Sequence, residues 1–392
     1  MKVDILIKNG RLIDPKRNLD QTGDLYLKAG KIFALPEGEQ ADPGYVLNAA
    51  GCLVIPGMID YHEHVNYNLS EVGIPADLAT LPKGVTTVVD CGTSGPTNCL
   101  GFIERLNALL VKSRLYIHIS PLGLSTRQYY APLLPEKWDL DQFDYVFEKG
   151  GEKIRGIKMR VSTYVLKEQG MRPFFEMLKV AEHCKKPVLI HPSDPPAPQR
   201  EILNALRPGD VYCHTYQGKG HTILDGGEKG RLIPELFKAR ERGVIFDIAH
   251  GGGNFDFEVA ERAMEQGFLP DMISTDMTKM TWNKKPVCNL PYVMSKFLML
   301  GMPLMEVIRC VTETPARALG MENRIGTLAP GACGDVAVLR VAEGDFVFND
   351  TQGHMRTGQK LMYPVATFVD GMMVYQDPLF SAEQEFVFGL KK

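Results

Sequence analysis

The chain has 392 residues and a formal net charge of −3. This near-neutral balance gives no reason to expect a nucleic acid or an anionic membrane as a partner, and it leaves small molecules as ligands. No uninterrupted apolar run approaches ~20 residues, and the N-terminus lacks a long apolar core. We therefore expect a cytoplasmic protein, a homo-oligomer, without a membrane segment. The eight cysteines form no CxxC pair and are expected to be buried reduced thiols.

Short alternating runs occur near both ends of the chain. Residues 4–8, 24–27 and 31–35 alternate between apolar and polar side chains, and turn residues separate them. The same alternation of apolar and polar side chains returns at residues 334–339 and 363–375. Because strict alternation is typical of half-buried strands, we predict that the two ends together form one small β domain.

A repeating pattern of apolar runs and helix-like stretches fills the middle of the chain. Buried strands that alternate with helices predict a parallel sheet with right-handed crossovers, and eight such units predict a closed (β/α)8 TIM barrel. An open doubly wound sheet is the alternative, but no run is followed by a GxGxxG or P-loop motif. The eight runs are Val54–His64, Thr86–Cys91, Leu115–Pro121, Ile154–Arg160, Pro187–His191, Asp210–His214, Gly243–Ile248 and Asp271–Asp276.

These patterns divide the chain into a barrel and a smaller domain. We predict a barrel over residues 54–322 and a β-sandwich built from residues 1–53 and 323–380. Residues 381–392 form a tail to which the sequence assigns no partner.

Polar residues close several of the apolar runs. In a barrel of this kind the carboxyl ends of the strands carry the chemistry. His62 and His64 are two residues apart, so on a strand both imidazoles point to one face. An imidazole-rich set at equivalent strand ends indicates a divalent metal site. The further candidate ligands are Lys158, His191, His214 and Asp276. The other interpretation of Lys158 is an ordinary ion-pairing lysine, with Asp276 as its partner.

Several motifs spread over nearly the whole chain resemble one family. They are PGMIDYHEHV, GIKMRVS, LIHPSD, VYCHTY, ISTDMT, ETPARALG and GDVAVL. Together they resemble the binuclear, dihydroorotase-like branch of the amidohydrolase superfamily, whose barrel is flanked by a small β-sandwich. RPGDVYCHTY and ARERGVIFDIAHGGGNF further resemble a subgroup of deacetylases and acyl-ester hydrolases, one of them characterised as cleaving acylated mandelate esters.

The resemblance implies two divalent ions, with Zn²⁺ expected and Mn²⁺, Fe²⁺ or Co²⁺ as alternatives. It assigns His62, His64 and Asp276 to one ion, His191 and His214 to the other, and Lys158, carboxylated by CO2, to both. The charges agree with this assignment. Two ions bring about +4, and Asp276, a carboxylated Lys158 and a bridging hydroxide leave about +1, which would stabilise an oxyanion.

The implied reaction is metal-dependent hydrolysis of a small molecule. A bridging hydroxide would attack a cyclic or N-acyl amide or an acyl ester, and Asp276 would act as the catalytic group that accepts and returns the proton. The alternatives are a dihydroorotase proper, a metal-free structural or signalling scaffold, and a deaminase of an amino-heterocycle. Every ligand position is filled, which argues against the scaffold, and Lys158 argues against the deaminase.

Three residues are candidates for substrate binding. Asn66 stands where dihydroorotases carry the arginine that binds the substrate carboxylate, so we expect poor dihydroorotase activity. Arg160 lies two residues beyond Lys158 on the same strand face. His250 precedes a glycine run that allows close backbone approach to a ligand, although a helix capped by Asn254 is an equal interpretation.

Overall fold

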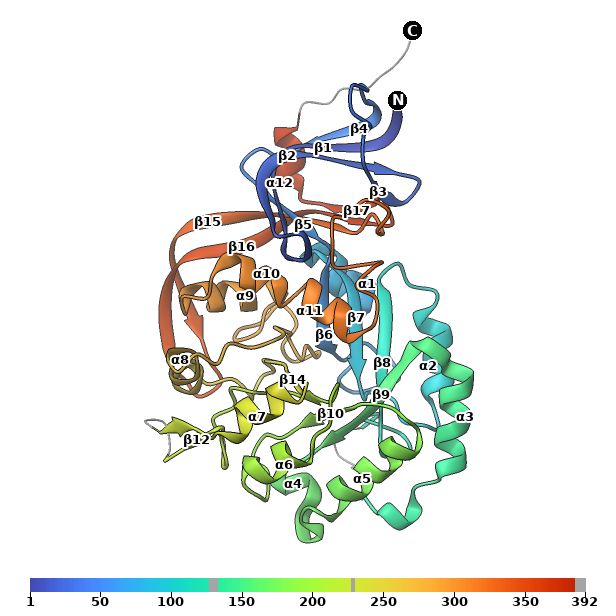
Figure 1. Cartoon of the computed structure of the whole chain (residues 1–392), viewed down its shortest axis with the longest axis vertical. Coiled ribbons are helices and arrows are strands. Elements are labelled where there is room, and N and C mark those ends of the chain that lie inside the picture. Colours follow the sequence, from blue (N-terminus) through green and yellow to red (C-terminus); the bar gives the residue numbers. More distant parts are fainter. Residues whose placement is uncertain (127–132, 227–229, 385–392) are drawn as a thin grey trace.

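Two sheets organise the chain, a parallel one of seven strands and a mixed one of eight (Figure 1). The structure is a computed structural model that describes residues 1–126, 133–226 and 230–384. Within these residues no helix is both long enough and apolar enough to cross a membrane.

The parallel sheet follows the predicted order of the chain. Its strands are β6 (Met58–Glu63), β7 (Val85–Cys91), β8 (Lys112–His118), β9 (Ile154–Arg160), β10 (Val188–His191), β11 (Val211–Tyr212) and β14 (Ile245–Phe246). Every residue of β6 and β7 is buried, as the continuous apolar runs predict for a sheet that is covered on both faces. Seven of the eight predicted runs thus contribute a strand to this sheet.

The eighth predicted run is not a regular strand, yet it lies between the two edge strands. Isolated parallel bridges join Met272 to Asp247, just after β14, and Met277 to Glu63 of β6. The amide of Asp276 also donates to the His62 carbonyl at 2.7 Å. Asp276 has a φ of 48°, and this left-handed conformation interrupts the extended backbone. The run therefore contacts both edges of the sheet without forming a ladder.

Helices follow most strands of the parallel sheet. Phe174, Met177 and Ala181 recur at helical spacing in α5 and are all buried, as the sequence predicts. Leu109 and Leu110 continue the three- and four-residue spacing of Phe102 and Leu106 in the sequence, but they lie beyond the end of α2. The helices are α1 (Ala76–Thr80), α2 (Cys99–Leu106), α3 (Leu140–Gly150), α4 (Thr163–Leu166), α5 (Arg172–His183), α6 (Gln199–Ala205), α7 (Glu235–Glu241), α8 (Phe257–Glu265), α9 (Leu290–Met299), α10 (Leu304–Arg309), α11 (Glu313–Ala318) and α12 (Pro378–Glu383).

Both chain ends contribute to the mixed sheet, which confirms their predicted association. Its order is β17-β16-β15-β5-β1-β2-β3, with β4 paired to β1. The eight strands form one connected sheet, so the sandwich of two facing sheets stays a prediction. The bounds are β1 (Lys2–Asp14), β2 (Leu19–Lys28), β3 (Lys31–Phe33), β4 (Asp42–Asn48), β5 (Leu53–Pro56), β15 (Val336–Asn349), β16 (Met355–Val369) and β17 (Met372–Gln376). A two-stranded ribbon, β12 (Leu224–Asp225) with β13 (Arg231–Leu232), stands apart from both sheets. Residues 385–392 of the predicted tail lie outside the described residues.

The first predicted run, 54–64, is divided between the two sheets. Its first part lies in β5, which pairs with β1 and β15 in the mixed sheet. Only Gly57 separates β5 from β6 of the parallel sheet. A Cβ atom at Gly57 would lie 2.2 Å from the Thr86 hydroxyl oxygen, so only glycine fits this junction. The sequence signal for a single strand was wrong here because both strands are apolar and nearly contiguous.

The long hairpin of β15 and β16 reaches from the mixed sheet along the side of the parallel sheet, beside α9 (Figure 1). The Met362 amide in β16 donates to the Ser295 hydroxyl of α9 at 2.9 Å. The C-terminal part of the chain is therefore attached to the helical layer as well as to the N-terminal strands.

Candidate metal centre

The six predicted ligands come together at the carboxyl end of the parallel sheet. β6 supplies His62, and His64 follows that strand directly. Lys158 lies near the end of β9, and His191 is the last residue of β10. We call this set, His62, His64, Lys158, His191, His214 and Asp276, the metal centre. All six side chains are almost completely buried or line one cavity.

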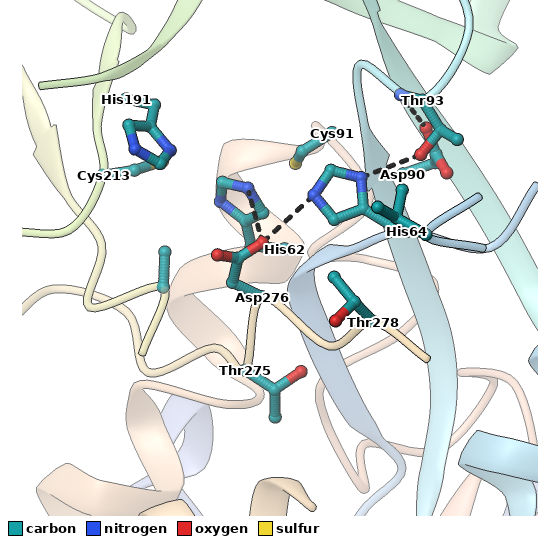
Figure 2. A network of polar contacts seen from close by, with 12 residues as sticks. His62, His64, Asp90, Cys91, Thr93, His191, Cys213, Thr275, Asp276 and Thr278 are labelled. Carbon is teal, nitrogen blue, oxygen red and sulfur yellow. Dashed lines mark hydrogen bonds and ion pairs between the residues drawn. The ribbon is translucent and has the colours of Figure 1, made fainter. Parts of the chain in front are cut away.

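The first group within the metal centre is His62, His64 and Asp276 (Figure 2). His64 Nε2 lies 3.1 Å from Asp276 Oδ1, and His62 Nε2 lies 3.7 Å from the same oxygen. One ligand atom from each of the three residues lies within 4.8 Å of the ligand atoms of the other two. Two imidazoles and a carboxylate at these distances suit a divalent transition ion.

The second group is His191 and His214, which face each other across the neighbouring strands. His214 Nε2 lies 2.6 Å from His191 Nδ1. The ring of His214 is also 5.4 Å from the ring of His62, measured between centroids. The two groups are therefore adjacent, as a binuclear site requires.

Lys158 contacts the first group and lines the same cavity as His191. Its side chain is 1% exposed, and Nζ is 3.0 Å from His62 Nε2. Gly92, which follows β7 two strands away in the sheet, leaves space for this side chain, because a Cβ there would lie 2.6 Å from Lys158 Cγ. The lysine amine thus reaches the first group of the metal centre from β9.

The orientation of the histidine rings fits metal ligation. The Nδ1–H of His214 donates to the Ala249 carbonyl at 2.6 Å, and Nδ1 of His64 lies 2.8 Å from the Thr93 hydroxyl. Nδ1 of His62 points toward Asp247 at 3.7 Å. His64 and His214 are thus held from outside through Nδ1 and point Nε2 inward, the usual arrangement of metal-binding imidazoles, whereas Nδ1 of His62 makes no hydrogen bond.

The protonation states of the metal centre also fit metal ligation. Burial, followed by the charge of Lys158, lowers the pKa of His62 well below its ordinary value. Burial lowers the pKa of His214 to about 3, and burial with the neighbouring His214 lowers the pKa of His191 strongly. Burial opposes ionisation of Asp276, but the His64 hydrogen bond and nearby charges outweigh it and hold the carboxyl pKa low. At neutral pH His62, His191 and His214 are neutral and Asp276 is ionised, the forms that bind metals.

A cavity of about 770 Å³ opens onto the metal centre. His64, Lys158, His191 and Asp276 line its inner part. Its other walls carry three cationic side chains, Arg160, Lys219 and Lys285, and the carboxylate Asp194, together with Tyr164, Met280 and residues 252–254. The cavity has the size of a small-molecule site.

Comparison with known proteins identifies the family. The sequence is 33% identical to a deacetylase of Brucella anthropi over 357 residues, which cover 88% of this chain and 86% of that protein. This chain belongs to the amidohydrolase family. The Amidohydrolase family profile matches residues 253–374. A deacetylase of Enterococcus faecalis is 28% identical over 95% of this chain and 99% of its own length.

Solved structures place this amidohydrolase among hydrolytic enzymes of similar fold. A dihydroorotase superposes with a TM-score of 0.85 at 30% identity, over 95% of this chain and 98% of that one. An adenine deaminase superposes with a TM-score of 0.85 at 27% identity, over 96% and 100% of the two chains. The predicted superfamily and the prediction of a hydrolase are confirmed.

The three predicted substrate residues of this amidohydrolase differ in position. Arg160 lines the cavity, and its guanidinium lies 5.0 Å from the centroid of the Tyr164 ring. Asn66 and His250 are buried and are not among the lining residues, although residues 252–254 beside His250 are. Contact of Asn66 and His250 with substrate stays a prediction, as does the assignment of each metal ligand.

Two supports of the metal centre escaped the sequence analysis. The Thr93 amide, just after β7, donates to Asp90 at 2.9 Å, and its hydroxyl meets His64 (Figure 2). Asp247, near His62, accepts hydrogen bonds from the Ser274 hydroxyl at 2.7 and 2.8 Å, and burial raises its pKa to about 7. Asp247 closes the seventh apolar run, so its position at a strand end was the available signal. Thr93 gave no signal, because threonine is common after strands.

Proposed function

We propose that this amidohydrolase is a binuclear, metal-dependent hydrolase that cleaves an amide or acyl ester of a small molecule. The observation that supports this most is the convergence of four imidazoles, Asp276 and Lys158 at the inner end of one cavity, which His64, Lys158, His191 and Asp276 line. Neutral imidazoles and an ionised carboxylate are the forms that hold divalent ions.

Two divalent ions, most consistent with Zn²⁺, fit the two adjacent groups of the metal centre. His62, His64 and Asp276 would hold one ion and His191 and His214 the other, with carboxylated Lys158 shared between them. Such ions lower the pKa of water toward about 7 and polarise a carbonyl group. The neutral form of the Lys158 amine would react with CO2 to give an anionic carbamate, which offsets the positive charge of the ions.

The protein residues supply orientation and proton transfer. Asp276 is ionised at neutral pH and faces the cavity, so it can accept a proton from the attacking water and return it to the leaving nitrogen or oxygen. His64 holds the Asp276 carboxylate at 3.1 Å, and Thr93 in turn orients His64. The buried floor limits access of bulk water to the reacting carbonyl.

The charges of the cavity support a substrate that carries a carboxylate. Arg160, Lys219 and Lys285 line the walls, against a single carboxylate outside the metal centre. Curated relatives are named deacetylases, in agreement with an acylated amino or hydroxy acid. Asn66, buried and uncharged, offers no counterpart to the arginine of dihydroorotases, so dihydroorotate is the less favoured substrate.

The finer architecture belongs to the same proposal. We infer that the segment 272–277 closes the parallel sheet into an eight-stranded barrel, since it bridges both edge strands. The domain limits 54–322 for the barrel and 1–53 with 323–380 for a flanking β-sandwich remain part of this proposal, as do a cytoplasmic, homo-oligomeric enzyme and the use of CO2.

A substrate panel tests the proposed function. Protein loaded with zinc or manganese would be assayed on N-acyl amino acids, acylated hydroxy acids, hydantoins and dihydroorotate. We expect the highest kcat/KM with an acylated acid and little turnover of dihydroorotate. A kcat/KM for dihydroorotate well above that of all other substrates would refute the argument from Asn66. Active protein that contains no stoichiometric metal would refute the metal centre.

A further inference from the structure

A second polar cluster lies deep in the core, behind the cavity wall. Lys296 occupies α9, a helix whose residues are buried from Leu290 to Phe297, and its own side chain is fully buried. In the part of the chain that the structure describes, no carboxylate forms an ion pair with it. A buried lysine without such a partner is costly, so a compensating role is expected.

The ammonium group of Lys296 uses its three N–H donors on three different segments. Nζ donates to His250 Nε2 at 2.7 Å, to the Pro286 carbonyl at 2.7 Å and to the Asn349 carbonyl at 2.6 Å. These acceptors come from the loop after β14, the loop before α9 and the end of β15. A protonated lysine has three donors and no acceptor, so this geometry suits its charged form.

Aromatic rings complete the surroundings of Lys296. Nζ lies 5.6 Å from the Phe255 centroid and 5.3 Å from that of Tyr292, within range of cation–π attraction. Burial lowers the pKa of Lys296 to about 7. The ammonium form therefore predominates at pH 6.

Lys296 dictates the tautomer of His250. Because Nε2 of His250 accepts from the ammonium group, the ring proton must reside on Nδ1, which donates to the Gly251 carbonyl at 2.9 Å. The His250 ring also stacks on Phe255, with centroids 4.5 Å apart. The ring is thus fixed by a donor on one side, an acceptor on the other and an aromatic face.

The loop that His250 holds lies against the metal centre. A Cβ on Gly251, which has a φ of 55°, would lie 2.6 Å from the Asp276 carboxylate. Gly252, Gly253 and Asn254 continue from it along the cavity wall, and Pro286, which Lys296 binds directly, lines the same cavity. A single ammonium group therefore connects two walls of the cavity.

We propose that Lys296 is a positioning residue for the hydrolytic site: its ammonium group sets the Nδ1–H tautomer of His250 and thereby holds residues 251–254 and Pro286 in place at the cavity wall. It touches neither the metal centre nor the cavity. The kinetic consequence of this inference rests on the proposed function. The tautomer of His250 and the position of residues 251–254 and Pro286 do not depend on turnover of any substrate.

Two variants on α9 separate positioning from simple core stability. Lys296→Met keeps the length of the side chain and removes all three donors. Ser295→Ala is the matched control, because its hydroxyl is buried on the same helix, donates to Pro291 and accepts from Met362 without contacting either cavity loop. Both variants weaken the core, but only the first releases residues 251–254 and Pro286.

Hydrogen–deuterium exchange of the zinc-loaded variants at pH 6 is the first measurement. We expect exchange in peptides that cover residues 249–256 and 283–289 to rise about tenfold or more in Lys296→Met, since the variant leaves three buried acceptors without their donor. In Ser295→Ala these peptides should exchange as in the unchanged protein. Equal exchange in Lys296→Met and the unchanged protein, or equal increases in both variants, would overturn the proposal.

The ¹⁵N chemical shifts of the His250 ring in the unchanged protein give a measurement that no folding defect can obscure. An Nδ1–H tautomer at pH 6 is expected, and an Nε2–H tautomer or an imidazolium would overturn the proposal.

The kinetic measurement uses p-nitrophenyl acetate and the best acylated acid of the panel. For Lys296→Met we expect KM for the acid to rise about tenfold, with a smaller change in kcat and unchanged zinc content. A fall in kcat alone, with KM unchanged, would overturn the positioning role. Failure of the enzyme to hydrolyse any panel member would count against the proposed function and would leave the exchange and tautomer results fully readable.

Discussion

Two clusters in this protein use the same residue types and have the spacing of metal sites, yet their hydrogen bonds differ. One is the metal centre. The other, which we call the turn cluster, consists of Asp256, Asp350 and His354, and its ligand atoms also lie within 4.8 Å of one another. Composition and distance alone therefore do not separate the two.

The turn cluster is saturated by backbone donors. Asp350 Oδ1 accepts the amides of Gln352, Gly353 and His354, each at 2.8 Å. Its Oδ2 accepts from His354 Nδ1 at 2.8 Å and from the Phe257 amide at 3.1 Å. These bonds shape the turn between β15 and β16 and the start of α8, and they leave little capacity for an ion.

The metal centre shows the opposite pattern. Among the described residues, no backbone N–H donates to the Asp276 carboxylate. Nε2 of His62 and of His64 face this carboxylate, and Nε2 of His214 faces Nδ1 of His191. A positive ion would satisfy all of these lone pairs at once. The comparison teaches that the destination of the hydrogen bonds, more than the residue types, distinguishes a metal centre from a structural cluster.

Replacement of a ligand in the second group gives the largest expected effect. His191→Ala or His214→Ala should reduce the metal content from about two ions per chain to about one and abolish nearly all turnover, with the fold retained. Elemental analysis and circular dichroism would check this. His354→Ala is the control from the turn cluster and should keep the full metal content; two ions per chain with normal activity in His191→Ala would refute the ligand assignment.

Lys158→Ala should have the next largest effect, because it removes the proposed bridge between the two groups. Metal affinity and turnover should both fall, and short carboxylic acids that occupy the vacated space should restore part of each. Intact native mass of the unchanged, fully metallated protein should show the added mass of CO2. An unmodified lysine in active protein would contradict carboxylation.

Thr93 gives a smaller effect, because it acts on the metal centre through His64. Thr93→Val removes the hydroxyl partner of Nδ1 and should weaken zinc affinity about 10- to 100-fold, the usual cost of losing a partner of a ligating histidine. Thr93→Ser keeps the hydroxyl and should restore affinity. The measurement is competition with a chelating dye, and equal affinities of the two variants would remove Thr93 from this role.

The smallest effect is expected in the turn cluster. The hydrogen bond to Asp350 raises the pKa of His354 above its ordinary value. A raised folded-state pKa stabilises the fold fully below about pH 6.5, and the contribution is lost as pH rises through the raised value. Because His354 is about one-third exposed, the contribution should stay below ~1 kcal/mol. Urea unfolding of the unchanged protein and His354→Gln should differ most near pH 6 and converge by pH 9; divergence with rising pH would contradict this sign.

The sequence was most informative where burial is continuous. The runs Thr86–Cys91 and Ile154–Arg160 predicted the strands Val85–Cys91 and Ile154–Arg160 to within a residue, because strands covered on both faces are rich in apolar side chains. The ligands followed from the rule that active residues cluster at the carboxyl ends of such strands. The candidate ligands His62, His64, Lys158, His191, His214 and Asp276 were all selected in this way; the structure brings them together, and their binding of metal stays a prediction.

The features that the sequence did not predict depend on contacts between segments that are far apart in the chain. Lys296 carries no signal in a single sequence, since its acceptors lie 46, 10 and 53 residues away. The division at Gly57 was missed because apolar periodicity cannot distinguish one long strand from two consecutive ones that belong to different sheets. The eighth run failed as a strand because the left-handed φ of Asp276 is a property of the assembled site.

The one-residue junction at Gly57 also sets the order in which the enzyme can be completed. β5 pairs with β15, whose residues 336–339 are made long after His62 and His64 have left the ribosome. Until that late strand is made, β5 lacks one of its two neighbours. β6, whose end carries the first two candidate ligands, then follows directly, after Gly57, a strand of an incomplete sheet. We therefore expect stable metal binding to require the late strand, and a chain that ends before Val336 should retain less than stoichiometric metal by elemental analysis.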